Sequence, residues 1–118
     1  MSIVLPISST ICHLKLTNRE LEKLSPQQLN QVVASTTSEY IYIDSGDGRF
    51  DPMIAAAIRL VTSKGYMVVV GNGSVPLVFA RAHWAMLGGF EEEGGERIFS
   101  HFLVKARKLR KFVVVQLG

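Results

Sequence analysis

Apolar residues along this chain fall into short runs, and polar turns with helix-capping residues separate these runs. Residues 2–16 alternate weakly between apolar and polar positions, which predicts one or two strands with a break near Pro6. Thr17 and Glu20 have the spacing of a capping box, so residues 17–24 are expected to form a short helix or turn.

The middle of the chain continues with a helix, a strand and another helix. A serine–proline pair opens a predicted helix over residues 25–34, because proline suits the first helical position. Residues 40–43 are of strand type. Asp51 and Pro52 predict the cap and first turn of the next helix, and Gly65 predicts its end.

The last third of the chain predicts two helices between two strands. Residues 66–70 form a continuous apolar run, typical of a strand buried on both faces. Ser74 is expected to cap a helix that runs to about Leu87, and Glu96 opens the last helix. Residues 112–117 are predicted as a final buried strand, which could also lie at a sheet edge and invite pairing. The last helix has an apolar stripe with i, i+3, i+4, i+7 spacing: Ile98, Phe99, Phe102, Leu103, Ala106 and Leu109.

The predicted element order is β-α-β-α-β-α-α-β, and this alternation indicates the α/β class. We expect a mostly parallel or mixed sheet of about four or five strands flanked by helices. The chain shows no linker, repeat or low-complexity segment, so residues 1–118 are predicted to form a single domain.

Composition indicates the class of protein and its expected location. The chain is 47% apolar and 19% charged, which is ordinary for a globular protein. No apolar run approaches the roughly 20 residues of a membrane span, and the first residues lack a secretory pattern. The single cysteine, Cys12, is expected to be a small core residue. These features predict a cytoplasmic protein without a membrane partner.

Charge is distributed unevenly along the last third of the chain, although the net charge is only +3. An acidic cluster consists of Glu91, Glu92, Glu93 and Glu96, and a basic cluster consists of Lys105, Arg107, Lys108, Arg110 and Lys111. Acids at the start and bases at the end of a helix complement its dipole, which is the favoured explanation. The alternative is a patch that binds nucleic acid or an acidic partner.

The loop after residues 40–43 holds three aspartates and two glycines. Loops at the carboxyl ends of parallel strands are where α/β folds bind their ligands. We therefore expect the partner- or ligand-binding residues in this loop and in the next strand-end turn: Asp44, Ser45, Asp47, Gly48, Arg49, Asn72 and Ser74. The alternative is a plain polar turn, in which Asp and Gly supply the required dihedral angles and Asp51 is only a cap.

No catalytic, metal or cofactor site is predicted from the residues themselves. The aspartate spacing does not fit the EF-hand loop, and the three histidines are far apart in the sequence. Gly71 and Gly73 resemble the start of a dinucleotide fingerprint, but Pro76 stands where the third glycine belongs. A helix start at Ser74 could still bind an anion through its N–H groups.

Residues 16–93 resemble a STAS domain, the anti-sigma-factor-antagonist fold. The matching segments are YIYID, the loop to Asp51, the helix to Gly65, YMVVV and HWAMLGGF. This resemblance implies a STAS-like sandwich that acts as a non-enzymatic switch by binding a partner protein through its loop-and-helix edge. In that family a serine at the start of the helix after the loop can be phosphorylated. Asp51 and Pro52 stand there in this chain, so the phosphorylation switch is not carried over.

A second resemblance is to Clp-type serine peptidases and the wider crotonase-like fold. The segment IDSGDG, Ser74 and His101 follow the order of an oxyanion loop, a nucleophile and a base. The proline and paired glycines of that oxyanion loop are replaced here, and no acidic third member can be assigned. The resemblance implies at most a hydrolase that has lost its activity.

The sequence therefore predicts a regulatory or protein-interaction module that docks a partner protein through residues 44–51 and 71–74. The chain could also bind a second copy of itself and form a homodimer. The alternatives are a degenerate hydrolase that uses Ser74 and His101, and a nucleic-acid-associated protein that uses the basic last helix.

Overall fold

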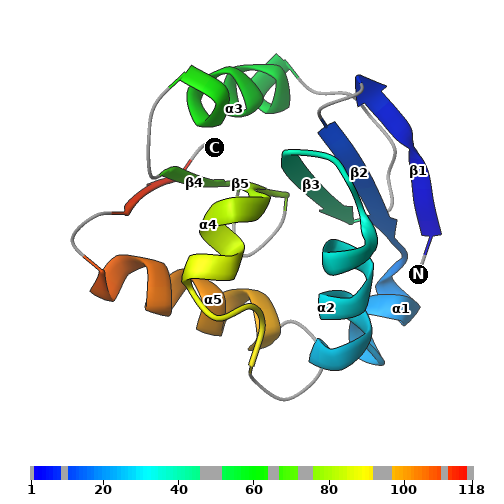
Figure 1. Ribbon diagram of the computed structural model, residues 1–118. Helices are drawn as coiled ribbons and strands as arrows, with labels where there is room; N and C mark the ends of the chain where they lie inside the picture. Colours follow the sequence, from blue (N-terminus) through cyan, green and yellow to red (C-terminus); the bar gives the residue numbers. More distant parts are fainter. Residues whose placement is uncertain are drawn as a thin grey trace.

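In the part of the chain that the structure describes, six strands join in one mixed sheet, and helices lie on both of its faces (Figure 1). The computed structural model describes residues 2–8, 11–45, 52–63, 67–71, 76–91, 97–109 and 112–116. Within these residues the strand order is β1-β2-β3-β5-β4-β6. The strands are β1 (Ser2–Ser8), β2 (Ile11–Leu16), β3 (Tyr40–Ser45), β4 (Met67–Val70), β5 (Leu77–Ala80) and β6 (Val113–Gln116). The helices are α1 (Asn18–Glu22), α2 (Pro26–Ser35), α3 (Pro52–Ser63), α4 (Arg81–Met86) and α5 (Arg97–Lys108).

The predicted caps at the first two helices are confirmed. Thr17 Oγ1 accepts from the Glu20 N–H at 3.1 Å, and Glu20 Oε1 accepts from the Thr17 N–H at 3.2 Å. This reciprocal capping box starts α1. Ser25 Oγ accepts from the Gln28 N–H at 3.1 Å and starts α2, with Pro26 as its first residue.

The helix predicted from Ser74 to Leu87 is wrong, because its first half contains a strand. Residues Leu77–Ala80 form β5, which pairs antiparallel with both β3 and β4, and only Arg81–Met86 form a helix. All four residues of β5 are buried. A short apolar run fits a buried strand and a buried helix equally well, so its period alone could not decide.

The β4–β5 hairpin closes at Gly71, whose N–H donates to the Pro76 carbonyl at 2.7 Å. The glycine is required by close approach: a Cβ at Gly71 would lie 2.5 Å from Pro76 Cδ. Because β5 takes the place of the helix predicted after Ser74, that helix no longer supports the expected anion site, and Ser74 itself lies outside the described residues.

The two faces of the sheet carry two separate cores. Helix α3 covers one face, where Ala57 and Val61 pack with Tyr42, Val69 and Val78. Helices α1, α2, α4 and α5 lie on the opposite face (Figure 1). The core of that second face is larger and includes a group of aromatic side chains, Phe79, Phe90, Phe99, Phe102 and Phe112, together with Cys12. Cys12 is thus the buried core residue that was expected.

The predicted apolar stripe of the last helix is largely confirmed, but the predicted burial of the last strand is not. In α5, five residues of the stripe are buried, while Leu109, which follows the helix, is 45% exposed. Strand β6 lies at the edge of the described sheet, and its Val113 is 53% exposed. The prediction of a fully buried last strand is therefore wrong, and the alternative of an edge strand is confirmed.

The predicted α/β class with a mixed sheet flanked by helices is confirmed. Among the described residues the sheet has six strands instead of four or five, because β1 and β2 form an antiparallel pair and β5 replaces part of a helix. In the part of the chain that the structure describes, no helix has the length and apolar character to cross a bilayer.

The Gly71→Ala substitution is expected to lower the free energy of unfolding by roughly 1–3 kcal/mol, because the new methyl group overlaps the Pro76 ring. Urea denaturation measures this cost. Replacing Pro76 by Ala removes the ring atoms that clash, so Gly71→Ala should cost less in a Pro76→Ala background. An equal cost in both backgrounds would show that the Pro76 ring is not the constraint.

Candidate functional site

The carboxyl ends of four strands meet at one edge of the sheet. Strand β2 is parallel to β3, β4 is parallel to β6, and β5 runs antiparallel to both β3 and β4. Strands β2, β3, β4 and β6 therefore all end at the same edge, which we call the carboxyl edge. In register, Leu77 of β5 pairs with Ile43 on one side and with Val70 on the other.

This register places the ends of β3 and β4 two strand spacings apart, or about 10 Å. The segments 46–51 and 72–75 start from these two ends. The sequence left the strand order open; in the described residues β3 and β4 end at the same edge, with β5 between them.

The structure describes only some of the predicted site residues. Asp44 is described and is 9% exposed. Ser45 is the last residue of β3, and its side chain lies outside the described part. The remaining members, which also lie outside the described residues, are Asp47, Gly48, Arg49, Asn72 and Ser74.

Asp44 belongs to a polar cluster on the α3 side of the β2–β3 pair. His13 Nε2 lies 3.8 Å from Asp44 Oδ2. The imidazole of His13 stacks on the Tyr42 ring, with centroids 4.3 Å apart and planes inclined by 24°. Lys15 is the register partner of Asp44, so their side chains share the same face. We call these four residues, His13, Lys15, Tyr42 and Asp44, the β2–β3 polar cluster.

His13 and Lys15 were not predicted from the sequence as neighbours of Asp44. Their only sequence signal is alternation: positions 13 and 15 in β2, and 42 and 44 in β3, are two residues apart. That signal becomes useful only once the parallel register of β2 and β3 is known.

Burial favours the uncharged form of His13 in the β2–β3 polar cluster. The pKa of His13 is lowered from its ordinary value of 6.5, chiefly by burial, while nearby Asp44 acts in the opposite direction and Lys15 lowers it further. His13 is therefore mainly uncharged near pH 7. The cluster contains an imidazole, a phenol and a buried carboxylate, and no group of three metal-ligating side chains gathers among the residues described.

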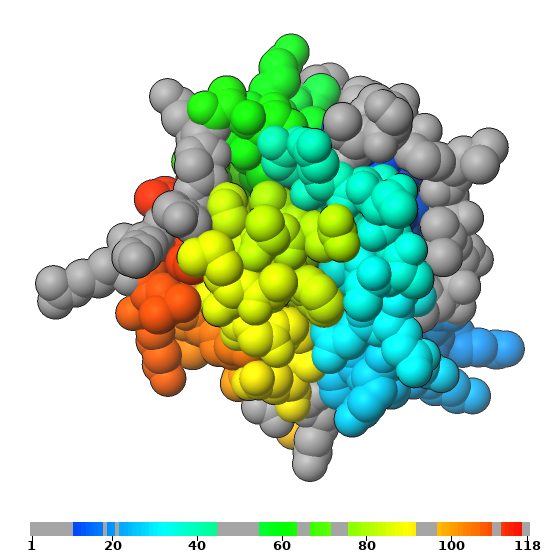
Figure 2. All heavy atoms as spheres, in the orientation of Figure 1, coloured from blue at the N-terminus to red at the C-terminus, as the bar shows by residue number. Residues whose placement is uncertain are grey.

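A second feature is a groove between α2 and α4, which lie side by side (Figure 2). Its volume is about 550 Å³. It is lined by Asn30, Gln31, Ala34, Trp84, Ala85, Gly88 and Gly89. These side chains carry no charge, and most of them are small.

Asn30 fixes the wall of this groove through the backbone of Phe90. Its Nδ2 donates to the Phe90 carbonyl at 2.8 Å, and its Oδ1 accepts from the Phe90 N–H at 2.9 Å. Gly88 and Gly89 have φ values of 86° and 75°, a conformation that favours glycine, and they end α4. Asn30 thus holds the connection after α4 against α2.

The basic cluster at the end of α5 is partly used for structure. Lys105 Nζ lies 3.1 Å from Glu91 Oε2 and donates to the Gly89 carbonyl at 3.3 Å. Arg107 and Lys108 are exposed in the last turn of the helix. Arg110 and Lys111 lie outside the described residues.

Of the two residues of the hydrolase alternative, the structure describes only His101. His101 is half-buried on α5. Ser74 lies outside the described residues, and the helix that it was expected to open is replaced by β5.

Comparison of the chain with protein-family models, with curated proteins and with solved structures returned no match. Function is therefore inferred from the chain's own residues and their geometry.

Acidification is expected to destabilise the protein through His13. The lowered pKa means that the unfolded chain binds a proton more readily than the folded one. The free energy of unfolding should be highest above pH 6.5 and should fall as the pH drops through 6.5 toward the lower folded pKa. The His13→Gln variant should show a flatter pH dependence in urea denaturation.

His83 provides the internal comparison for this experiment, because burial also lowers its pKa. The His83→Gln variant should remove a separate part of the pH dependence, and the double variant should be the flattest. An unchanged pH dependence in His13→Gln would contradict the assignment.

The Asn30→Ala variant is expected to lose roughly 1–3 kcal/mol of stability, because both polar groups of the Phe90 backbone lose their partner. The neighbouring Gln31→Ala variant is the matched control, since Gln31 is exposed. Thermal and urea denaturation compare the two. Equal stability of the two variants would mean that the Asn30 bonds do not support the fold.

Proposed function

We propose that this protein is a non-enzymatic interaction module that docks a partner protein at the carboxyl edge, through residues 44–51 and 71–74. The observation that carries this proposal is the register of β5: Leu77 pairs with both Ile43 and Val70, so the two strand-end segments start beside each other. Two segments that leave a sheet at neighbouring points can form one continuous recognition surface.

The scaffold beneath this surface is rigid, which suits recognition. Ile43, Val70 and Leu77 are each at most 1% exposed, so the ends of the three strands are set in the core. Asp44 is held among His13, Lys15 and Tyr42. Its low exposure gives Asp44 the role of anchoring the segment that follows.

The contacts with the partner then belong to Asp47, Arg49, Asn72 and Ser74, which follow the anchored strand ends in the sequence. A carboxylate, a guanidinium, an amide and a hydroxyl can together recognise a polar protein surface. Ser45 and Gly48 belong to the same segment and complete the proposed surface.

The resemblance to STAS domains supports the same function, because members of that family bind partner proteins without catalysis. A cytoplasmic setting belongs to this proposal, and the single buried cysteine agrees with it. The hydrolase and nucleic-acid alternatives have less support: a strand follows Ser74, and Lys105 of the basic cluster is engaged by Glu91 and Gly89.

Affinity capture from native lysate, followed by mass spectrometry, tests the proposal. The Asp47→Ala and Arg49→Ala variants should fold normally and should retain roughly a fifth or less of the partner that the wild type captures. Arg59→Ala is the matched control, because Arg59 is an exposed arginine on α3. Equal capture of the same proteins by Asp47→Ala, Arg49→Ala and wild type would disprove the carboxyl edge as the docking surface.

A further inference from the structure

The two edge strands of the sheet differ in how well they are protected. Edge strand β1 contains Pro6, and its pairing with β2 is irregular between Val4 and Ser8. Both features discourage another strand from pairing with β1. Strand β6 pairs with β4 in a continuous parallel register from Val113 to Gln116, and it contains no proline, charged residue or bulge.

The unprotected edge at β6 is also apolar. Val113 is 53% exposed, whereas Val114 and Val115 are half-buried against the two cores. Leu109, just before the strand, is 45% exposed. In the described part of the sheet no strand lies on the outer side of β6.

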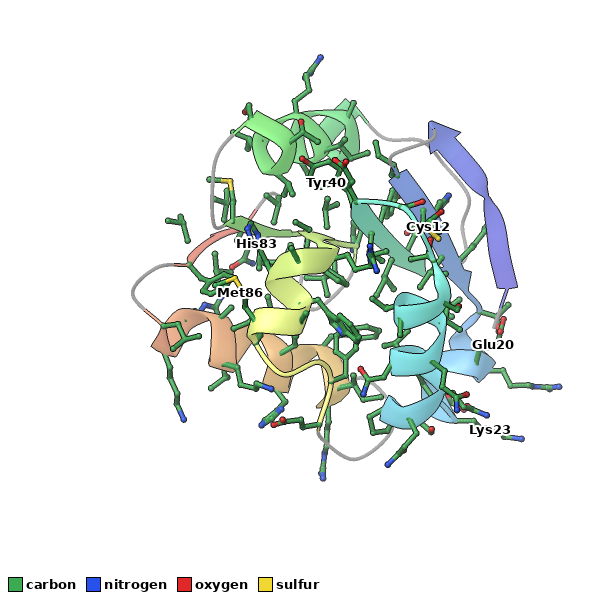
Figure 3. All side chains as sticks on the ribbon, in the orientation of Figure 1. Cys12, Glu20, Lys23, Tyr40, His83 and Met86 are labelled. Carbon is green, nitrogen blue, oxygen red and sulfur yellow. The ribbon has the colours of Figure 1, made fainter. Side chains whose placement is uncertain are left out.

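Helix α4 adds a further apolar side chain beside this edge. His83 contacts the Phe112 ring edge to face, with centroids 5.6 Å apart. Met86 is one helical turn after His83, and Figure 3 shows both on the same side of α4. Met86 is 53% exposed. Three exposed apolar side chains thus belong to β6 and to the segments next to it: Met86 on α4, Leu109 after α5 and Val113 on the strand itself.

Positive charge lies next to the start of β6. The Phe112 N–H donates to the Leu109 carbonyl at 2.9 Å, so the end of α5 lies next to the start of the strand. Arg107 and Lys108, in the last turn of α5, are exposed. The negative end of the α5 dipole lies there and stabilises these two cations. Both side chains are therefore available to a partner that carries negative charge.

We infer that the edge of β6 binds an extended, acidic segment of a partner protein, which adds a strand to the sheet. Backbone hydrogen bonds to β6 provide affinity, as in other cases of strand addition. β-Branched residues of the segment cover Val113 and Val115, which share one face of the sheet. If the segment runs antiparallel to β6, its carboxyl-terminal acids lie beside Arg107 and Lys108.

A second copy of the chain fits this edge less well. In an antiparallel pair of β6 strands, Gln116 of one copy would lie near Arg107 and Lys108 of the other, and its side chain carries no charge. Charge complementarity therefore favours a different, acidic segment over self-pairing.

Fluorescence anisotropy with two labelled synthetic peptides tests this inference on the full chain. One peptide alternates valine and threonine and ends in a run of glutamates, and the other ends in lysines. The glutamate peptide should bind more tightly, and amide hydrogen exchange should show new protection in residues 113–116. The Arg107→Glu/Lys108→Glu double variant should weaken its binding roughly tenfold.

Two further variants keep the test specific. Arg97→Glu changes an exposed residue at the opposite end of α5 and should leave peptide binding unchanged. Val113→Lys places a charge on the edge and should weaken both peptides while leaving the fold intact, since Val113 is more than half exposed.

Three results would overturn the inference. They are no binding of the glutamate peptide by the wild type, equal binding of both peptides, or a wild-type dimer in native mass spectrometry that Val113→Lys dissociates. The last result would show that a second copy occupies the edge.

Discussion

The structure depends on one short strand at the centre of the sheet. All four residues of β5 are buried, and both of its neighbours pair antiparallel to it. This arrangement forces β3 and β4 to run in the same direction although no hydrogen bond joins them directly. Because Leu77 is in register with Ile43 and Val70, the position of β5 also sets where the chain leaves the sheet toward both proposed binding segments.

One face of the sheet carries the larger, aromatic core, and the other carries a smaller core with the β2–β3 polar cluster. On the face opposite α3, the Phe90 ring lies 4.9 Å from the Phe102 ring and 5.9 Å from the Phe79 ring, measured between centroids. Asn30 holds the Phe90 backbone in place, so this aromatic group also fixes the connection after α4. On the α3 face the core is smaller, and the β2–β3 polar cluster occupies its margin near the carboxyl edge. Asp44 is thus a buried part of the scaffold that supports the proposed contact residues.

The carboxyl edge and the basic residues beside β6 lie at opposite ends of parallel strands. Val70 and Gln116 are register partners at the carboxyl edge, whereas Met67 pairs with Val113 at the other end of β4 and β6. A partner at the carboxyl edge and an acidic segment beside Arg107 and Lys108 would therefore contact different parts of the molecule. An interaction module with two separate surfaces can join two proteins, and the rigid central sheet would hold them at a fixed distance.

The sequence by itself determined the elements whose signals are local. The capping box of Thr17 and Glu20, the cap at Ser25 and the apolar stripe of α5 each act within one or two helical turns, so they predicted the structure correctly. Only the tertiary structure decided that residues 77–80 form a strand, that His13 lies beside Asp44 and that β6 is an edge. Each of these outcomes depends on pairing between strands far apart in the sequence. Such pairing is chosen by burial and register across the whole sheet, and neither is encoded in a local run of residues.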